Sequence, residues 1–332
     1  MKKNVAIVGA TGAVGQELLA VLERLEYPVG TLRPLASPRS AGSTVRFAGR
    51  DVTVEVAGPE SFAGIDVAFF SAGATRSREL VPHAREAGAL VIDNSSAFRM
   101  TPDVPLVVPE VNPEALRGHQ GVIANPNCVA AILTVALAPL RQLGAIRRLV
   151  IATYQSASGA GARAMEDLEV QTRAALAGEP VVAKVLRHPY AFNLFSHDSA
   201  VEDNLYNGEE NKVVAETRKI LGQPDLGISI TCVRVPVLRA HTEVVNVEFD
   251  RAVDVEAARD VLAAAPGLAL VDDPAENHFP MPNETSGTDA VRVGRVRRDP
   301  SCDHALNLLI CGDQLLKGAA LNAVQIAQAL QD

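Results

Sequence analysis

Short apolar runs alternate with helical periodicity along the first part of the chain. Residues 5–8 are apolar at every position, and a glycine-rich segment follows them. Between residues 14 and 25 apolar positions recur at the spacing of an amphipathic helix, and Pro28 lies beyond its end. Further apolar runs occupy residues 67–70, 90–92 and 122–124. Strands that are apolar throughout are typical of parallel sheets covered on both faces, so the pattern predicts a doubly wound α/β sheet.

The pattern changes after about residue 128. Residues 149–154, 228–235, 243–249, 291–296 and 305–311 read as strands with partial alternation, and 160–177, 208–221 and 254–264 read as helices. This predicts an α+β domain with a mixed sheet, whose partly polar face is open to a partner subunit. The amphipathic segment 315–330 is expected to pack back on the first domain. We therefore expect one domain at 1–127 plus 312–332, and a second at 128–311.

Composition narrows the class of protein. The 332 residues are 48% hydrophobic and 21% charged, as in ordinary globular proteins, and the net charge of -8 disfavours a nucleic-acid partner. The longest apolar stretch, residues 129–140, is too short to span a membrane, and the run before Gly9 is too short for a secretion signal. Four cysteines without a CxxC pair indicate a reducing, cytoplasmic setting, and seven scattered histidines predict no metal site.

The glycine-rich segment between the first strand and the first helix predicts a dinucleotide site. There the sequence reads GATGAVG. The residues of this segment that we expect to bind the cofactor are Gly9, Thr11, Gly12, Ala13, Val14 and Gly15. Glycines permit a tight turn and let backbone N–H groups approach a pyrophosphate at the helix N-terminus. The spacing is GxxGxxG and not GxGxxG, so the strand-turn-helix context carries the prediction of a Rossmann-type site.

The end of the second expected strand indicates which dinucleotide is bound. An NAD site usually has an acidic residue there to bind the ribose 2′-hydroxyl. This sequence instead has Ser37, Arg39 and Ser40, which can hold a 2′-phosphate, so NADP(H) is expected. A solvated loop arginine is the alternative interpretation of Arg39.

Cys128 is the candidate nucleophile. It follows Asn125-Pro-Asn127 where a strand gives way to an apolar helix, with Asn127 as a suitable N-cap. A thiol in the first turn of a helix is exposed to the helix dipole, which stabilises the thiolate. Most cysteines are instead small buried hydrophobes, and Cys232, Cys302 and Cys311 are assigned to that class.

Motifs along the whole chain resemble the aspartate-semialdehyde dehydrogenase family. They occur in the same order at similar separations: GATGAVG (9–15), SAG (71–73), DNSSAFR (93–99), NPNC (125–128), TYQSASGAG (153–161), CVRVPVLRAHTE (232–243) and DQLLKGAA (313–320). The resemblance implies NADPH-dependent reductive dephosphorylation of L-4-aspartyl phosphate to L-aspartate 4-semialdehyde through a cysteine thioester. This reaction belongs to the biosynthesis of lysine through diaminopimelate, and of methionine, threonine and isoleucine.

The resemblance also implies roles for individual residues. Cys128 is the nucleophile and His241 the acid/base, although a lone histidine is more often an ordinary half-buried one. Gln155 orients the substrate near the thiol, and Arg234 clamps its carboxylate with a planar fork.

The remaining implied contacts concern the substrate's charged ends and the cofactor. Glu209 meets the substrate ammonium, and Lys212 and Arg99 meet the phosphate. Without the resemblance, Glu209 and Lys212 would read as a surface ion pair on one helix face. Ser71 and Gly73 contact the cofactor, and Ser158, Gly159 and Gln314 lie near its nicotinamide end. Gln314 departs from the asparagine common in the family, which leaves that contact open.

Two alternatives stay open at this stage. The N-acetyl-glutamyl-phosphate reductase family shares the cysteine chemistry and NADPH, but its cysteine typically lies between glycine and tyrosine, and here it lies between Asn127 and Val129. A sensor or structural protein could keep the fold without the chemistry. The expected partners are a small-molecule substrate and inorganic phosphate, and the expected assembly is a homodimer through the second domain.

Overall fold

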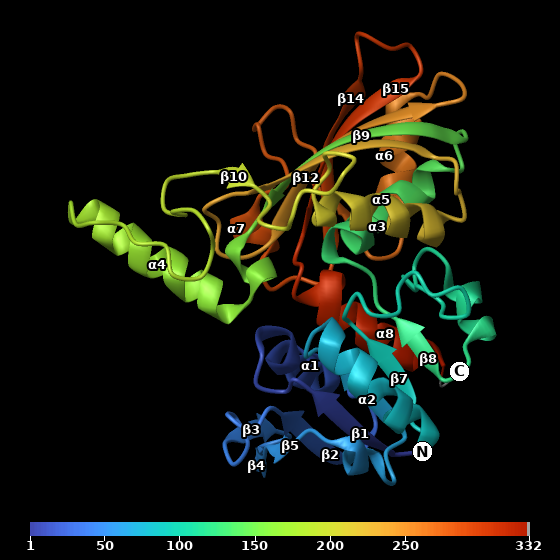
Figure 1. The fold of residues 1–332 in the computed structure, drawn as a ribbon. Coiled ribbons are helices and arrows are strands. Elements are labelled where there is room, and N and C mark those ends of the chain that lie inside the picture. Colours follow the sequence, from blue (N-terminus) through green and yellow to red (C-terminus); the bar gives the residue numbers. More distant parts are fainter. Residues whose placement is uncertain (331–332) are drawn as a thin grey trace. The chain divides into compact units, whose positions relative to one another are not determined.

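The computed structural model describes residues 1–330, which form two compact units (Figure 1). Unit 1 comprises Met1–Asn127 and the C-terminal segment that begins at Gly318, and unit 2 comprises Cys128–Lys317. Unit 1 is therefore discontinuous in sequence, and the chain returns to it after the last strand of unit 2, which ends at Gly312.

Unit 1 is built on a parallel six-stranded sheet of order β5-β2-β1-β6-β7-β8. Its strands are β1 (Lys3–Val8), β2 (Val29–Ala36), β5 (Glu55–Val56), β6 (Val67–Phe70), β7 (Leu90–Asp93) and β8 (Val122–Ala124). Its α-helices are α1 (Ala13–Arg24), α2 (Ala74–Glu86) and α8 (Leu321–Ala329), and α8 packs against α1 and β7.

Burial explains why these segments fold as they do. All four residues of β6 are buried, and so is the second half of β1, as strands covered on both faces require. In α1 the apolar stripe that includes Leu18, Val21 and Leu22 is buried. A hairpin of β3 (Thr44–Phe47) and β4 (Arg50–Thr53) was not predicted, because its strands are short and largely exposed.

Unit 2 is built on a mixed seven-stranded sheet of order β10-β11-β9-β12-β15-β14-β13. Its strands are β9 (Ile146–Gln155), β10 (Phe195–Ser196), β11 (Gly227–Arg234), β12 (His241–Phe249), β13 (Leu268–Leu270), β14 (Val291–Arg298) and β15 (Ala305–Gly312). Its α-helices are α3 (Cys128–Leu140), α4 (Ala162–Leu176), α5 (Gly208–Leu221), α6 (Val255–Ala264) and α7 (Pro282–Thr285).

Helix α3 is the core of unit 2. Nearly every residue from Val129 to Leu140 is buried, and α3 packs against α5, α6, β12, β14 and β15. Strand β12 alternates: every second residue from His241 to Phe249 is buried and those between are half-exposed. One face of the sheet is therefore covered by helices and the other is partly open. The predicted fold class, a Rossmann-type sheet plus an α+β domain with a mixed sheet, is confirmed.

The C-terminal segment differs in detail from the continuous helix that was predicted. A π-helical turn, Leu316–Ala320, precedes α8. Within residues 1–330, no helix combines the length and the apolarity that crossing a bilayer requires.

Candidate active site

The glycine segment of unit 1 brings the backbone close to a neighbouring strand end. Gly9 has a φ of 94°, and a Cβ at this position would lie 2.6 Å from the carbonyl oxygen of Ser71. A Cβ at Gly15 would overlap the carbonyl oxygen of Gly9. Helix α1 begins directly after Gly12, with no side-chain cap on its first N–H groups. The segment therefore leaves helix N–H groups available in the way a pyrophosphate site requires.

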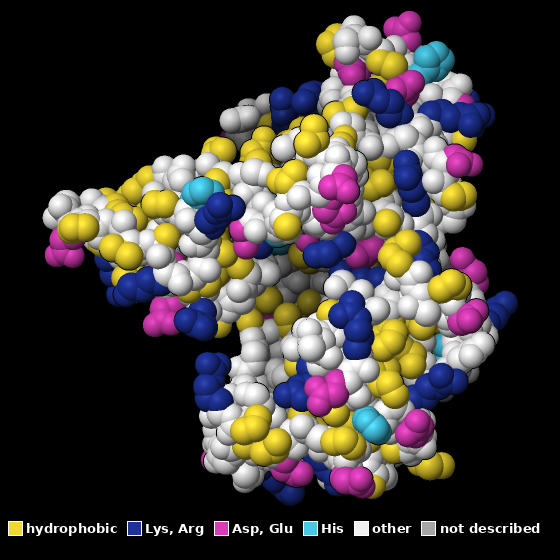
Figure 2. All heavy atoms as spheres, in the orientation of Figure 1, with side chains coloured by type: hydrophobic (Ala, Val, Ile, Leu, Met, Phe, Trp, Pro, Cys, Tyr) yellow, Lys and Arg dark blue, Asp and Glu magenta, His cyan; other side chains and the backbone are white. Residues whose placement is uncertain are grey.

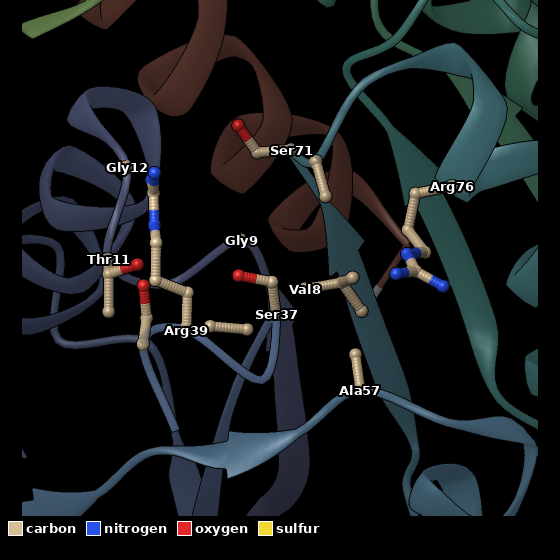
Figure 3. A pocket seen from close by; sticks show the side chains of 12 residues that line it. Val8, Gly9, Thr11, Gly12, Ser37, Arg39, Ala57, Ser71 and Arg76 are labelled. Atoms are coloured by element: carbon tan, nitrogen blue, oxygen red, sulfur yellow. The ribbon is translucent and has the colours of Figure 1, made fainter. Parts of the chain in front are cut away.

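A cavity of about 340 Å³ lies over this segment (Figure 3). Of the predicted cofactor residues, seven line it: Gly9, Thr11, Gly12, Ser37, Arg39, Ser40 and Ser71. Ala13, Val14 and Gly15 form the first turn of α1, and Gly73 precedes α2 with a φ of 86°. Among the described residues that line the cavity none is acidic.

Sequence reasoning missed part of this cavity. Figure 3 shows Thr11 and Arg39 on one side and Arg76, from the first turn of α2, on the other. Arg76 pairs with Glu79 at 2.7 Å, three residues along the helix. In sequence such a pair looks like a surface ion pair, so only the fold reveals that Arg76 borders the cavity.

Four predicted site residues of unit 2, with catalytic, substrate-binding and cofactor-binding roles, lie at one edge of its sheet. Gln155 ends β9 and Arg234 ends the parallel strand β11, where the two residues are direct neighbours. His241 begins β12, which runs antiparallel to β9 and β15. Gln314 follows the end of β15, two residues after Gly312, the pairing partner of His241. Strand direction therefore places these four residues at the same edge.

His241 is fully buried and its ring is fixed on one side. Its Nδ1 accepts a hydrogen bond from the backbone N–H of Ser156 at 3.0 Å and lies 3.0 Å from the Ser156 hydroxyl. Burial, and next the positive charge of Arg234, hold the pKa of His241 well below its usual range, so the ring is neutral. A Cβ at Gly159 would lie 2.9 to 3.1 Å from atoms of His241 and Arg234, so this position accommodates only glycine without a shift.

Arg234 is oriented by a carboxylate that the sequence did not identify. Its Nε donates to Asp198 at 3.0 Å and its Nη1 to the Ser156 carbonyl at 3.3 Å. Partial burial disfavours the Asp198 carboxylate, but the charge and hydrogen bond of Arg234, together with His197 and a backbone hydrogen bond, outweigh this and lower the pKa of Asp198. These contacts use Nε and one hydrogen of Nη1, so the other guanidinium hydrogens can donate to a second carboxylate.

The N-terminus of α5 holds the two residues expected to bind the substrate's ammonium and phosphate. Asn207 caps this helix by accepting from the N–H groups of Glu209 and Glu210, in a capping box. Glu209 is buried, accepts from the Gln155 amide at 3.2 Å and lies 3.8 Å from the Lys212 ammonium. Lys212 is half-exposed.

Arg99 lies in unit 1 and is buried. It donates from Nε to the Asn125 carbonyl at 2.9 Å and from Nη2 to the Asn94 carbonyl at 2.7 Å. Asn125 in turn donates to the Asn94 side chain at 2.8 Å and accepts from Asn322 on α8 at 2.6 Å. The motifs at 93–99 and 125–128 therefore share one polar network, which also holds the C-terminal helix.

Cys128 is the first residue of α3 and is partly exposed. All four cysteines lie within the described residues, and none of them forms a disulfide there. Burial raises the pKa of the Cys232 and Cys311 thiols, in keeping with their assignment as structural cysteines. No cluster of potential metal ligands occurs within residues 1–330.

Besides Arg76, sequence reasoning missed Ser156, Asp198 and Tyr190. Tyr190 donates to the Gln155 carbonyl at 3.3 Å, and burial raises its pKa to about 12. Ser156 lies inside a quoted motif and could have been found there. Asp198 and Tyr190 lie in loop sequence without any periodic or motif signal, and only the tertiary structure brings them to the site.

The chain resembles known proteins over its full length. The family described as semialdehyde dehydrogenase, NAD binding domain, matches residues 4–119, and the family described as semialdehyde dehydrogenase, dimerisation domain, matches residues 137–317. An aspartate-semialdehyde dehydrogenase from Synechocystis sp. is 53% identical over 327 residues, which cover 98% of this chain and 97% of the relative.

Solved structures agree with the sequence matches. Aspartate semialdehyde dehydrogenase II from Vibrio cholerae, complexed with ASA, superposes with a TM-score of 0.97 at 43% identity, covering 100% of this chain and 98% of that one. The enzyme from Candida albicans, solved with NADP, superposes with a TM-score of 0.78 at 26% identity, covering 100% and 99%. With both family profiles matched and relatives this similar along the whole length, the chain belongs to the aspartate-semialdehyde dehydrogenase family.

Proposed function

We propose that this protein catalyses the NADPH-dependent reductive dephosphorylation of L-4-aspartyl phosphate to L-aspartate 4-semialdehyde, with Cys128 as nucleophile. The observation that carries the proposal is the convergence of Gln155, Arg234, His241 and Gln314 at one sheet edge, in a chain of this family. The product supplies the biosynthesis of lysine, methionine, threonine and isoleucine.

The reaction divides into two steps at the Cys128 sulfur. The thiolate attacks the acyl carbon and phosphate leaves, which forms a thioester. NADPH, when bound, supplies a hydride to that carbon. The carbon–sulfur bond then breaks, so that the aldehyde leaves and the thiolate returns. In this scheme His241 is the acid/base group beside the reacting carbon.

Charge complementarity supports the substrate assignment. The free edge of Arg234 suits the α-carboxylate, and buried Glu209 suits the α-ammonium. Gln155 is fixed by Thr153 and Glu209 and is proposed to orient the substrate. Lys212 and Arg99 are the proposed phosphate ligands.

The cavity in unit 1 fits NADP(H). It offers the N-terminus of α1 for a pyrophosphate, and Ser37, Arg39 and Ser40 for a 2′-phosphate, without a lining carboxylate to repel it. The relative from Candida albicans was solved with NADP. Ser158, Gly159 and Gln314 are proposed to lie near the nicotinamide end.

We further propose a cytoplasmic homodimer, since the mechanism needs a reduced cysteine and residues 137–317 match a dimerisation domain. Exposed apolar side chains support this assembly. They lie in unit 2, from the last residue of α4 to the loop before α5: Leu176, Val182, Phe192, Leu194, Val201 and Leu205. Figure 2 shows hydrophobic side chains along the α4 region.

A steady-state assay tests reaction, substrate and cofactor together. Aspartate semialdehyde is supplied with NADP⁺ or NAD⁺, with and without phosphate, and nucleotide reduction is followed. We expect phosphate-dependent reduction of NADP⁺ and a much lower kcat/KM with NAD⁺. N-acetyl-glutamate semialdehyde serves as the control substrate and should not turn over. Folded protein that reduces no nucleotide, or that needs no phosphate, would contradict the proposal.

A further inference from the structure

The cofactor cavity of unit 1 is lined by the segments that follow neighbouring parallel strands. The segment after β1 leads into α1 and offers its N–H groups to a pyrophosphate. The segment after β2 offers Ser37, Arg39 and Ser40 to a 2′-phosphate. The segment after β6 leads into α2 and brings Ala72 and Arg76 to the cavity. This last wall is left for a part of the dinucleotide that carries no phosphate.

The covalent structure of the cofactor indicates what lies against that wall. Adenine and the 2′-phosphate are attached to adjacent carbons of one ribose, so the base must lie beside the group that Ser37, Arg39 and Ser40 are proposed to hold. In Figure 3 the side chains of Arg39 and Arg76 lie on opposite sides of the cavity. Its apolar lining residues are Val8, Ala36, Ala57 and Ala72. Small apolar side chains between two cationic ones suit a flat, uncharged base.

The ion pair of Arg76 favours the base over the 2′-phosphate as its ligand. Arg76 Nη1 donates to Glu79 at 2.7 Å, one turn along α2. A phosphate placed against Arg76 would also approach this carboxylate and be repelled by it. A guanidinium that is held at its edge still presents two flat faces, and such faces stack on aromatic rings.

We infer that Arg76 is a further cofactor-binding residue, whose guanidinium stacks on the adenine ring of NADP(H). The inference rests on the proposed function and deepens it, because it divides the recognition of the adenosine between two arginines. Arg39 reads the 2′-phosphate, which distinguishes NADPH from NADH, and Arg76 binds the base, which both cofactors share. Arg76 therefore contributes affinity without contributing to the choice between them.

Binding titrations of two cofactors test this division directly. Fluorescence titration gives the Kd for NADPH and for NADH, which lacks the 2′-phosphate. Arg76→Ala should raise both Kd values by about 3- to 30-fold, the range of a cation–π contact, and by factors that agree within about threefold. Arg39→Ala should raise the Kd for NADPH far more than that for NADH. A loss confined to NADPH in Arg76→Ala, or no loss at all, would overturn the inference.

Two further variants separate stacking from charge. Arg78→Ala is the matched control, because Arg78 is an exposed arginine on the same helix and does not line the cavity. Its Kd values should stay within about twofold of those of the unmodified protein. Arg76→Lys keeps the charge but has no planar face, so it should bind both cofactors more weakly than the unmodified protein. An equal loss in Arg78→Ala, or full affinity in Arg76→Lys, would show that charge alone matters and overturn the inference.

NMR of arginine-labelled protein reports the stacking itself. Hydrogens that lie over the face of an aromatic ring shift upfield, so the Arg76 side-chain signals, identified by their absence in Arg76→Lys, should move upfield when NADPH is added. Unmoved or downfield-shifted signals would overturn the inference. These experiments measure binding and not turnover. Protein that binds NADPH through Arg76 without reducing NADP⁺ would contradict the proposed function alone, whereas protein that binds neither cofactor would overturn both proposals.

Discussion

Single side chains in this site depend on others for their orientation. Asp198 holds the Nε of Arg234, and the Ser156 carbonyl holds its Nη1, so the remaining edge of the guanidinium is presented in one direction. A lysine has one ammonium and no planar fork, so it cannot donate two parallel hydrogen bonds to one carboxylate while it also pairs with Asp198.

Arg234→Lys should therefore damage substrate use more than cofactor binding. We expect kcat/KM for aspartate semialdehyde to fall on the order of 10- to 100-fold, the cost of one charge-assisted contact. Arg148→Lys is the matched control, because Arg148 is half-exposed and pairs with Glu248. Unchanged steady-state kinetics in Arg234→Lys would show that Arg234 does not hold the carboxylate.

Cys128→Ala should abolish turnover and leave NADPH binding intact, because the thioester cannot form while the cavity of unit 1 is untouched. We expect kcat to fall by at least about 10⁴-fold. Fluorescence titration with NADPH measures whether cofactor binding is retained. Cys302→Ala, another partly exposed cysteine, should keep full activity. A Cys128→Ala protein that still turns over would rule out the thioester.

At the scale of elements, strand β12 carries a buried carboxyl group next to the active site. Glu243 lies on the same face as His241, is fully buried, and its two oxygens make no hydrogen bond within residues 1–330. Burial raises the pKa of Glu243 well above its ordinary value of 4.5. The folded chain thus keeps a proton there that the unfolded chain releases above pH 4.5, so this group lowers stability as pH rises.

Glu243→Gln should remove this pH dependence. We expect the variant to gain stability over the unmodified protein as pH rises from 5 to 8, by up to about 1.4 kcal/mol per pH unit, until the folded-state pKa is reached. Urea denaturation at several pH values measures the gap, which is the difference in free energy of unfolding between the variant and the unmodified protein. Glu248→Gln, from the half-exposed face of the same strand, should show no growing gap. A gap that stays constant for Glu243→Gln would contradict the argument.

At the scale of the whole molecule, the exposed apolar residues of unit 2 predict self-association. Light scattering after size exclusion should give twice the mass of one chain. Phe192→Asp should weaken the dimer, because Phe192 is 69% exposed within that apolar set. Met100→Asp is the control, because Met100 is also exposed but lies in unit 1. A monomeric unmodified protein, or equal dimer dissociation in both variants, would contradict the prediction.

The sequence by itself determined the elements and the chemistry that follows from local pattern. Apolar runs placed β6 and β8, helical periodicity placed α1 and α5, and the glycine segment indicated a dinucleotide site. The motifs placed Cys128, Arg234 and His241 in a family whose membership is now shown. Periodicity and turn chemistry are local, so they can be recognised without knowing which segments meet.

Only the tertiary structure decided which groups hold those residues in place. Asp198, Tyr190 and Ser156 orient the site through contacts between segments far apart in sequence, and Arg76 borders the cofactor cavity although its spacing suggests a surface ion pair. The orientation of the His241 ring was likewise not predictable from sequence. It is fixed by the backbone N–H of Ser156, whose direction exists only after β9 and β12 have paired.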